Sequence, residues 1–155
     1  MNFRTTQWIA CACTAFGAIG WVTSAHAQIG VGTWIRTITP ATPGDITMIV
    51  EACCNGGRRL TYRFGAVKQV MLIESAFDGK EVPVLFDGKP SGETMAITLV
   101  DSRHTTAIVK MNGKPFGVSK GTISADGKTL TVENDYSASV GGNPAGKQTE
   151  TWLRK

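Results

Sequence analysis

The sequence contains few of the residues and motifs that would identify an enzyme or a cofactor-binding protein. Histidine occurs only twice in the 155 residues, as His26 and His104, so any histidine-based catalysis beyond the N-terminal segment would depend on His104. Neither a His-Glu-x-x-His zinc motif nor a phosphate-binding loop is present. We therefore expect a protein that is not an enzyme and that uses no cofactor.

Charge of either sign is also sparse. Charged residues make up 18% of the chain, and 16 Lys and Arg against 12 Asp and Glu give a formal net charge of +4. The basic residues are scattered and form no stripe interleaved with aromatic side chains, which argues against a nucleic-acid partner. The 42% of apolar residues argues against a disordered chain, four cysteines are too few for a dense disulfide scaffold, and the length suits one domain.

Residues 1–27 are predicted to be a secretory signal peptide. Arg4 supplies a positive charge, and residues 8–22 form an uncharged, largely apolar run that is short for a membrane-spanning helix of about 20 residues. Ala25-His26-Ala27 provides the small-x-small pattern at which signal peptidase cleaves. The alternatives are an uncleaved membrane anchor and a lipoprotein signal ending at Cys11. Cleavage would leave residues 28–155 in a bacterial periplasm or outside the cell, and no later run is apolar enough to embed the protein in a membrane.

Beyond this segment, short β-type runs alternate with turn signals, and no helical periodicity is present. Apolar and polar residues alternate in Thr33–Thr39, Ile46–Cys53 and Thr94–Val100, as expected for strands buried on one face. Gly-Lys turn signals separate the runs, because Asp-Gly and Asn-Gly tolerate the positive φ of tight hairpins. These signals are Asp78–Lys80, Asp87–Lys89, Asn112–Lys114, Asp126–Lys128 and Ala145–Lys147.

Short connections favour sequential antiparallel pairing of roughly eight to ten strands in one domain. A meander of this length removes its exposed edges by closing on itself. We therefore predict an all-β, single antiparallel meander barrel over residues 28–155, with a flattened two-sheet sandwich as the alternative. Pro83 and Pro90 predict an edge or an irregular segment in the middle of the chain.

Two segments resemble the lipocalin-like (calycin) barrels. Gly32-Thr33-Trp34 resembles the Gly-x-Trp entry to the first strand of that superfamily, and Thr151-Trp152-Leu153-Arg154 resembles its closing strand. The resemblance implies a lipocalin-like barrel in which Arg154 lies across Trp34 and seals one end. A cation–π contact of this kind contributes roughly 0.5–2 kcal/mol.

Two further phrases are similar to those of a group of small exported bacterial proteins without an established activity. One is Asp-Gly-Lys-x-x-Pro-Val at residues 78–84, and the other is Ser-x-Asp-Gly-Lys-Thr-Leu-Thr at residues 124–131. This similarity marks a family and implies no particular chemistry.

Cys53-Cys54 is the most unusual feature of the sequence. Neighbouring residues on a strand point to opposite faces of the sheet, so a disulfide between them needs a tight turn, for which Asn55-Gly56-Gly57 supplies flexibility. Four interpretations stand: one core and one exposed thiol, a vicinal disulfide, a disulfide between two chains, and redox or soft-metal chemistry. The spacing argues against an oxidoreductase, because redox motifs separate the two sulfurs by two residues.

The other reactive side chains are interpreted as structural. Asp101–His104 is predicted to be a polar turn rather than a nucleophile–base pair, because catalytic groups must converge within about 3 Å and neighbours in a turn rarely do. One histidine and two adjacent cysteines are too few for a metal site. Four methionines that could suggest copper each lie singly in a β run and are interpreted as core; they are Met48, Met71, Met95 and Met111.

The barrel interior is the remaining candidate site. Its ligand-binding side chains are predicted to be Trp34, Tyr62, Phe64, Met95, Leu99, Phe116 and Trp152, and the other positions expected to face inward or to line the mouth are Met48, Val50, Ile97 and Val118. If the barrel is hollow, we expect a non-catalytic protein that binds a small apolar ligand. If the barrel is filled by its own side chains, we expect a structural or interaction module of the cell envelope, in which an exposed cysteine would serve dimerisation. The sequence does not predict the oligomeric state.

Overall fold

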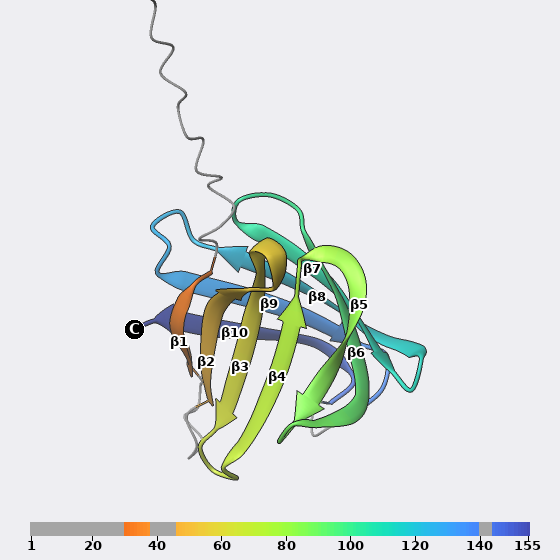
Figure 1. The fold of residues 1–155 in the computed structure, drawn as a ribbon. Helices are drawn as coiled ribbons and strands as arrows, with labels where there is room; N and C mark the ends of the chain where they lie inside the picture. The colour runs from red at the N-terminus through yellow and green to blue at the C-terminus, as the bar shows by residue number, and fades with distance from the viewer. Residues whose placement is uncertain (1–29, 38–45, 140–143) are drawn as a thin grey trace, which may run out of the picture.

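The chain forms a closed barrel in which each of ten antiparallel strands is hydrogen-bonded to the next, and β10 closes on β1 (Figure 1). The computed structural model describes residues 30–37, 46–139 and 144–155. The strands are β1 (Gly32–Thr37), β2 (Ile46–Cys53), β3 (Gly57–Phe64), β4 (Gln69–Ser75), β5 (Asp78–Phe86), β6 (Lys89–Leu99), β7 (His104–Met111), β8 (Lys114–Ile123), β9 (Thr129–Tyr136) and β10 (Gly146–Arg154). A 3-10 turn, η2 (Cys54–Gly56), joins β2 to β3, and the described residues contain no α-helix. The predicted all-β meander barrel is confirmed.

Two of the predicted turn signals form tight hairpins. Asp87-Gly88 joins β5 to β6, and Asn112-Gly113 joins β7 to β8. In both pairs the two residues have positive φ, which matches the right-handed twist of the flanking strands. Asp126–Lys128 also lies in a connection, between β8 and β9. Local turn chemistry therefore sets where these strands end.

Two other turn signals do not form turns. Asp78–Lys80 lies inside β5, where the register with β6 shifts between Asp78 and Glu81 and Gly79 has a φ of 80°. The Asp-Gly sequence is thus used for a β-bulge rather than for a hairpin. Gly146-Lys147 begins β10 instead of preceding it.

The irregular segment predicted around Pro83 is present in β5. A second register shift between β5 and β6 falls between Pro83 and Leu85. On its other side, β5 pairs with β4 at only two positions, Met71 with Phe86 and Leu72 with Leu85. Because proline has no backbone N–H, it removes a ladder hydrogen bond where it lies in a strand.

The antiparallel order gives the barrel two distinct ends. The start of β1, the disulfide turn η2 and the connections β4–β5, β6–β7 and β8–β9 lie at one end, which we call the Trp34 end. The connections β3–β4 (residues 65–68), β5–β6 and β7–β8 lie at the other, which we call the hairpin end. This arrangement decides which interior side chains lie near which end.

Trp34 is the centre of a closely packed cluster at the Trp34 end. Trp34 is fully buried and clusters with Met48, Val50 and Trp152 from β2 and β10. Its indole Nε1 donates to the Gly30 carbonyl at 2.7 Å. The Arg154 guanidinium lies over the Trp34 ring, 5.0 Å from the centroid, and donates to the Val31 carbonyl. The structure therefore has the Trp34–Arg154 contact that the lipocalin-like resemblance implies.

Val118 does not face the barrel interior as the alternation on β8 predicts. The pairing of β8 with β7 shifts between Val109↔Gly117 and Lys110↔Pro115, so Phe116 is an extra residue in the strand. One extra residue reverses the alternation of side chains beyond it. Phe116 is therefore buried, whereas Val118 is 43% exposed on the outer surface.

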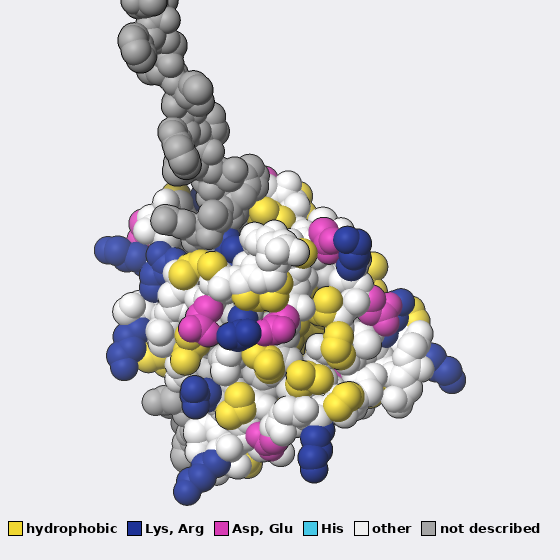
Figure 2. All heavy atoms as spheres, viewed as in Figure 1, with side chains coloured by type: hydrophobic (Ala, Val, Ile, Leu, Met, Phe, Trp, Pro, Cys, Tyr) yellow, Lys and Arg dark blue, Asp and Glu magenta, His cyan; other side chains and the backbone are white. Residues whose placement is uncertain are grey.

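Three further expectations from the sequence concern the surface charge, membrane-spanning segments and the N-terminal segment. On the face seen in Figure 2, Lys and Arg side chains are spread over separate places and alternate with Asp and Glu, in line with their scatter in the sequence. Among the described residues, no helix has the length and apolar character needed to span a membrane. The predicted signal peptide, residues 1–27, lies outside the described residues.

Candidate functional site

The barrel is hollow. Its interior holds a cavity of about 690 Å³, and all ten strands contribute side chains to the lining. Cavities of this size accommodate small organic molecules. The volume argues against a barrel that is filled by its own side chains.

Six of the seven predicted ligand-binding side chains line this cavity. They are Trp34, Tyr62, Phe64, Met95, Phe116 and Trp152. Leu99 does not line it, contrary to the prediction. Leu99 is the last residue of β6, and its N–H donates to the carbonyl of Phe77, whose own side chain lines the cavity at this end. Alternation places Leu99 on the same face of β6 as Met95 and Ile97, but at this level of the barrel the lining is formed by Phe77 and by Thr105, the ladder partner of Leu99.

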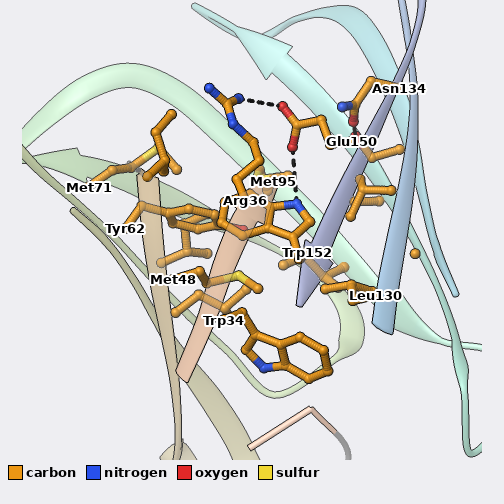
Figure 3. Close-up of a pocket in the computed structure, with 18 of the residues that line it drawn as sticks. Trp34, Arg36, Met48, Tyr62, Met71, Met95, Leu130, Asn134, Glu150 and Trp152 are labelled. Atoms are coloured by element: carbon orange, nitrogen blue, oxygen red, sulfur yellow. Dashed lines mark hydrogen bonds and ion pairs between the residues drawn. The ribbon is translucent and has the colours of Figure 1, made fainter. Parts of the chain in front are cut away.

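Sulfur is prominent in the lining. The four methionines interpreted as core from the sequence, Met48, Met71, Met95 and Met111, all border the cavity. Figure 3 labels the first three of them. Their unbranched thioether side chains adapt to irregular shapes and contact aromatic groups favourably. The wall is therefore suited to an apolar guest without imposing one rigid outline.

Aromatic pairs connect neighbouring parts of the wall. Tyr62 meets Trp152 edge to face at 5.8 Å, and nearer the hairpin end Phe64 stacks on Phe86 at 6.2 Å between ring centroids. Phe116 stacks on Tyr136 at 5.7 Å. A Cβ on Gly117 would lie 2.4 Å from the Tyr136 ring, so this ring position requires glycine on β8.

An ion pair is built into the cavity wall. Arg36 Nη1 donates to Glu150 Oε1 at 2.9 Å, and Glu150 Oε2 accepts a hydrogen bond from Trp152 Nε1 at 3.2 Å (Figure 3). The Arg36 and Glu150 side chains are 24% and 23% exposed, and the buried Arg36 Nε has no partner among the described residues. Alternation predicts that residues 150 and 152 share a face, but sequence alone does not show that Arg36 meets them across the strand boundary.

A second polar pair lies on β8 and β9. Ser119 Oγ donates to Asn134 Oδ1 at 2.6 Å, and both side chains are buried. Gly117-Val118-Ser119-Lys120-Gly121 matches the Gly-x-Ser-x-Gly pattern of serine hydrolases, but that motif functions on a sharp strand-to-helix turn, and here it runs along a strand. Ser119 therefore has an amide acceptor and not the histidine base that a nucleophilic serine needs.

Two tyrosine hydroxyl groups and one carboxyl group in the cavity have raised pKa values. Burial raises the pKa of Tyr62 and of Tyr136, and the charges of Glu150 and Glu93 raise both further. Burial also raises the pKa of Glu93. Within the described part of the chain, no side chain forms a hydrogen bond or an ion pair with the Glu93 carboxylate. Of the two carboxylates that line the cavity, Glu150 is paired and Glu93 has no partner among the described residues.

Cys53 and Cys54 form a vicinal disulfide. It lies in the connection between β2 and β3, where Cys54 and Asn55 have φ values of 50° and 54°. Glu74 is near both sulfurs, with all three ligand atoms within 4.8 Å, but the sulfurs are bonded to each other and Glu74 pairs with Arg59. The disulfide belongs to the Trp34 end and contributes nothing to the cavity lining.

Asp101 and His104 form a polar turn between β6 and β7. The Asp101 carboxylate accepts hydrogen bonds from the backbone N–H groups of Arg103 and His104 and contacts His104 Nδ1 at 2.7 Å. These hydrogen bonds hold the pKa of Asp101 below its usual value. Both side chains are exposed, and neither lines the cavity.

Comparison with known proteins shows the fold. No family model matches the sequence, and no curated protein matches it. Among solved structures, the barrel is similar to the wild-type fluorescent protein UnaG, with a TM-score of 0.58 and 14% identity over 81% of this chain and 97% of that chain. A single-residue mutant of UnaG gives a TM-score of 0.57 and 13% identity over 81% and 96% of the two chains. The chain therefore has a lipocalin-like (calycin) barrel fold, and identities this low establish nothing finer.

Proposed function

We propose that this protein is a non-catalytic binding protein that holds a small, largely apolar molecule inside its barrel. The observation that carries the proposal is the cavity of about 690 Å³ at the centre of the fold. A protein stabilised only by its own packing gains nothing from such a volume, because unfilled apolar space forfeits dispersion contacts. A molecule that fills the cavity would restore them.

The chemistry of the lining supports binding rather than catalysis. Aromatic and thioether groups make up much of the wall, while the serine and the histidine that could act as nucleophile and base lie apart. Ser119 bonds to Asn134, and His104 lies in an exposed turn. The similarity to the UnaG barrel adds support at the level of the fold.

A pair of substitutions on β7 tests the cavity. Ala107 is 6% exposed and lines the cavity, whereas its neighbour Ile108 is 49% exposed on the outside. A neutral solvatochromic dye such as Nile red should bind to the wild-type protein with a blue-shifted emission. Ala107→Phe should weaken this binding about tenfold or more by occupying the cavity, whereas Ile108→Phe should leave it unchanged.

Fluorescence titration measures the affinity for the dye, and circular dichroism shows whether each variant keeps its strands. Val132→Phe fills the same cavity from β9 and serves if Ala107→Phe loses its strand signal. Binding that is absent in the wild-type protein would overturn the proposal. An equal loss of dye affinity in Ala107→Phe and Ile108→Phe would show that the dye does not bind specifically in the cavity, and this result would also contradict the proposal.

Export of this protein is also proposed. Support comes from the signal-like residues 1–27 and from the Cys53–Cys54 disulfide, because disulfides persist mainly in oxidising compartments. The protein recovered from a periplasmic fraction should have the intact mass of residues 28–155 with one disulfide, and iodoacetamide should not label it before reduction. A full-length mass or free thiols would contradict this proposal.

A further inference from the structure

On the basis of the proposed binding function, we infer that the ligand has a hydrogen-bond-donating or cationic head, of the kind an alkyl amine carries, and that Glu93 receives this head. The apolar walls of the cavity would contact the apolar part of the ligand. The few charged groups of the cavity would therefore determine which polar head group binds. Apart from the two tyrosines, the ionisable side chains in the lining are Arg36, Glu93, Arg103 and Glu150.

Three of these four groups are already committed or lie elsewhere. Arg36 and Glu150 neutralise each other as an ion pair, and the buried Nε of the Arg36 guanidinium has no partner among the described residues. Arg103 belongs to the β6–β7 connection at the Trp34 end and is exposed to solvent. Glu93 remains as the carboxylate without a counter-ion.

Glu93 lies near the hairpin end of β6 in largely apolar surroundings. It pairs across the ladder with Met111, and Met95 is the next residue on the same face. A carboxylate in such a place loses hydration without gaining a partner, which costs free energy unless a donor approaches it. Burial accordingly raises the pKa of Glu93 with no opposing contribution from a cation or a donor.

Two carboxylates act on the part of the cavity around Tyr62 and Tyr136. Glu150 and Glu93 both act on the hydroxyl groups of Tyr62 and Tyr136, and each carboxylate raises the pKa of both tyrosines. A ligand carboxylate beside Glu93 would be repelled by it and would have to compete with Glu150 for Arg36. An ammonium group would instead complete a charge-assisted hydrogen bond with Glu93.

Three ligands with the same chain and different heads test the inference. Decylamine, decanol and decanoate are used to displace Nile red from the protein at neutral pH. We expect the amine to bind about tenfold more tightly than the carboxylate, with the alcohol between them. Glu93→Gln should lower the affinity for decylamine about tenfold and so remove most of the preference of the protein for the amine over decanol.

Glu133→Gln is the matched control, because Glu133 is an exposed residue of β9 outside the cavity lining and undergoes the same chemical change. Glu93→Met replaces Glu93→Gln if the amide variant loses its strand signal. Dye and decanol binding without a preference for the amine, or an amine affinity that Glu93→Gln does not change, would overturn the inference and leave the proposed function standing. Failure of dye, decanol and decylamine to bind would overturn both.

Discussion

Trp34→Ala is expected to lower the free energy of unfolding by about 4 kcal/mol. Trp34 is fully buried in the packed end of the barrel and contacts side chains from β2 and β10. Its removal deletes the dispersion contacts of the indole and the hydrogen bond from Nε1 to the Gly30 carbonyl. It also leaves a cavity beneath Arg154, which the surrounding strands can fill only in part.

Urea denaturation followed by circular dichroism measures this change. Arg154→Ala is the control, because it removes the guanidinium above the ring and leaves the indole in place. We expect the control to cost about 1 kcal/mol, since the guanidinium is exposed and the cation–π contact is modest. If Trp34→Ala lowers the free energy of unfolding by no more than Arg154→Ala does, the indole does not stabilise this end of the barrel as we describe.

Gly57→Ala is expected to cost about 3 kcal/mol or to prevent folding. A Cβ at this position would lie 2.2 Å from the Ser75 carbonyl oxygen and 2.7 Å from the Ala76 Cα. Both are backbone atoms, so relief requires β3 to move away from the end of β4. Gly57 has a φ of −81°, which any residue adopts, so space and not backbone conformation demands glycine here.

The neighbouring glycine provides the control. Gly56 has a φ of 93°, and a Cβ there would meet nothing within 4 Å. Gly56→Ala therefore tests positive φ without a collision, at a cost of about 1 kcal/mol. The midpoints and slopes of urea unfolding for both variants give the comparison. If Gly56→Ala is the more damaging change, the close approach of β3 to β4 is not the constraint we describe.

Strand alternation predicted most of the cavity wall and failed in identifiable places. Trp34, Tyr62 and Met95 lie on regular stretches and face the interior as predicted. Val118 is predicted on the wrong face because the bulge at Phe116 reverses the alternation. Pro115 and Gly117 on either side of Phe116 are residue types that often mark a bulge, and they are the signal that could have located it. Leu99 is predicted to line the cavity but does not, and Phe77, whose carbonyl accepts from the Leu99 N–H, lines it at this level instead.

The charged part of the site was not predictable from local sequence. Arg36, Glu93 and Glu150 look like ordinary polar residues of strands, separated by long stretches of chain. Arg36 meets Glu150 only because β10 closes on β1. Glu93 has no side-chain partner among the described residues because its inward neighbours are Met95, Met111 and Ser91, and the Ser91 hydroxyl donates to the Val84 carbonyl instead.

The amino-acid sequence by itself determined that this chain forms antiparallel strands, where several hairpins turn, and that Trp34 and Arg154 belong near its two closing strands. These properties depend on residues close together in the chain, where φ preferences and alternation act directly. Only the tertiary structure decided that the barrel is hollow, that Cys53 bonds to Cys54, and that the Glu93 carboxylate faces the cavity without a counter-ion among the described residues. Those properties depend on the register and closure of ten strands, and one extra residue in a strand is enough to change which side chains meet.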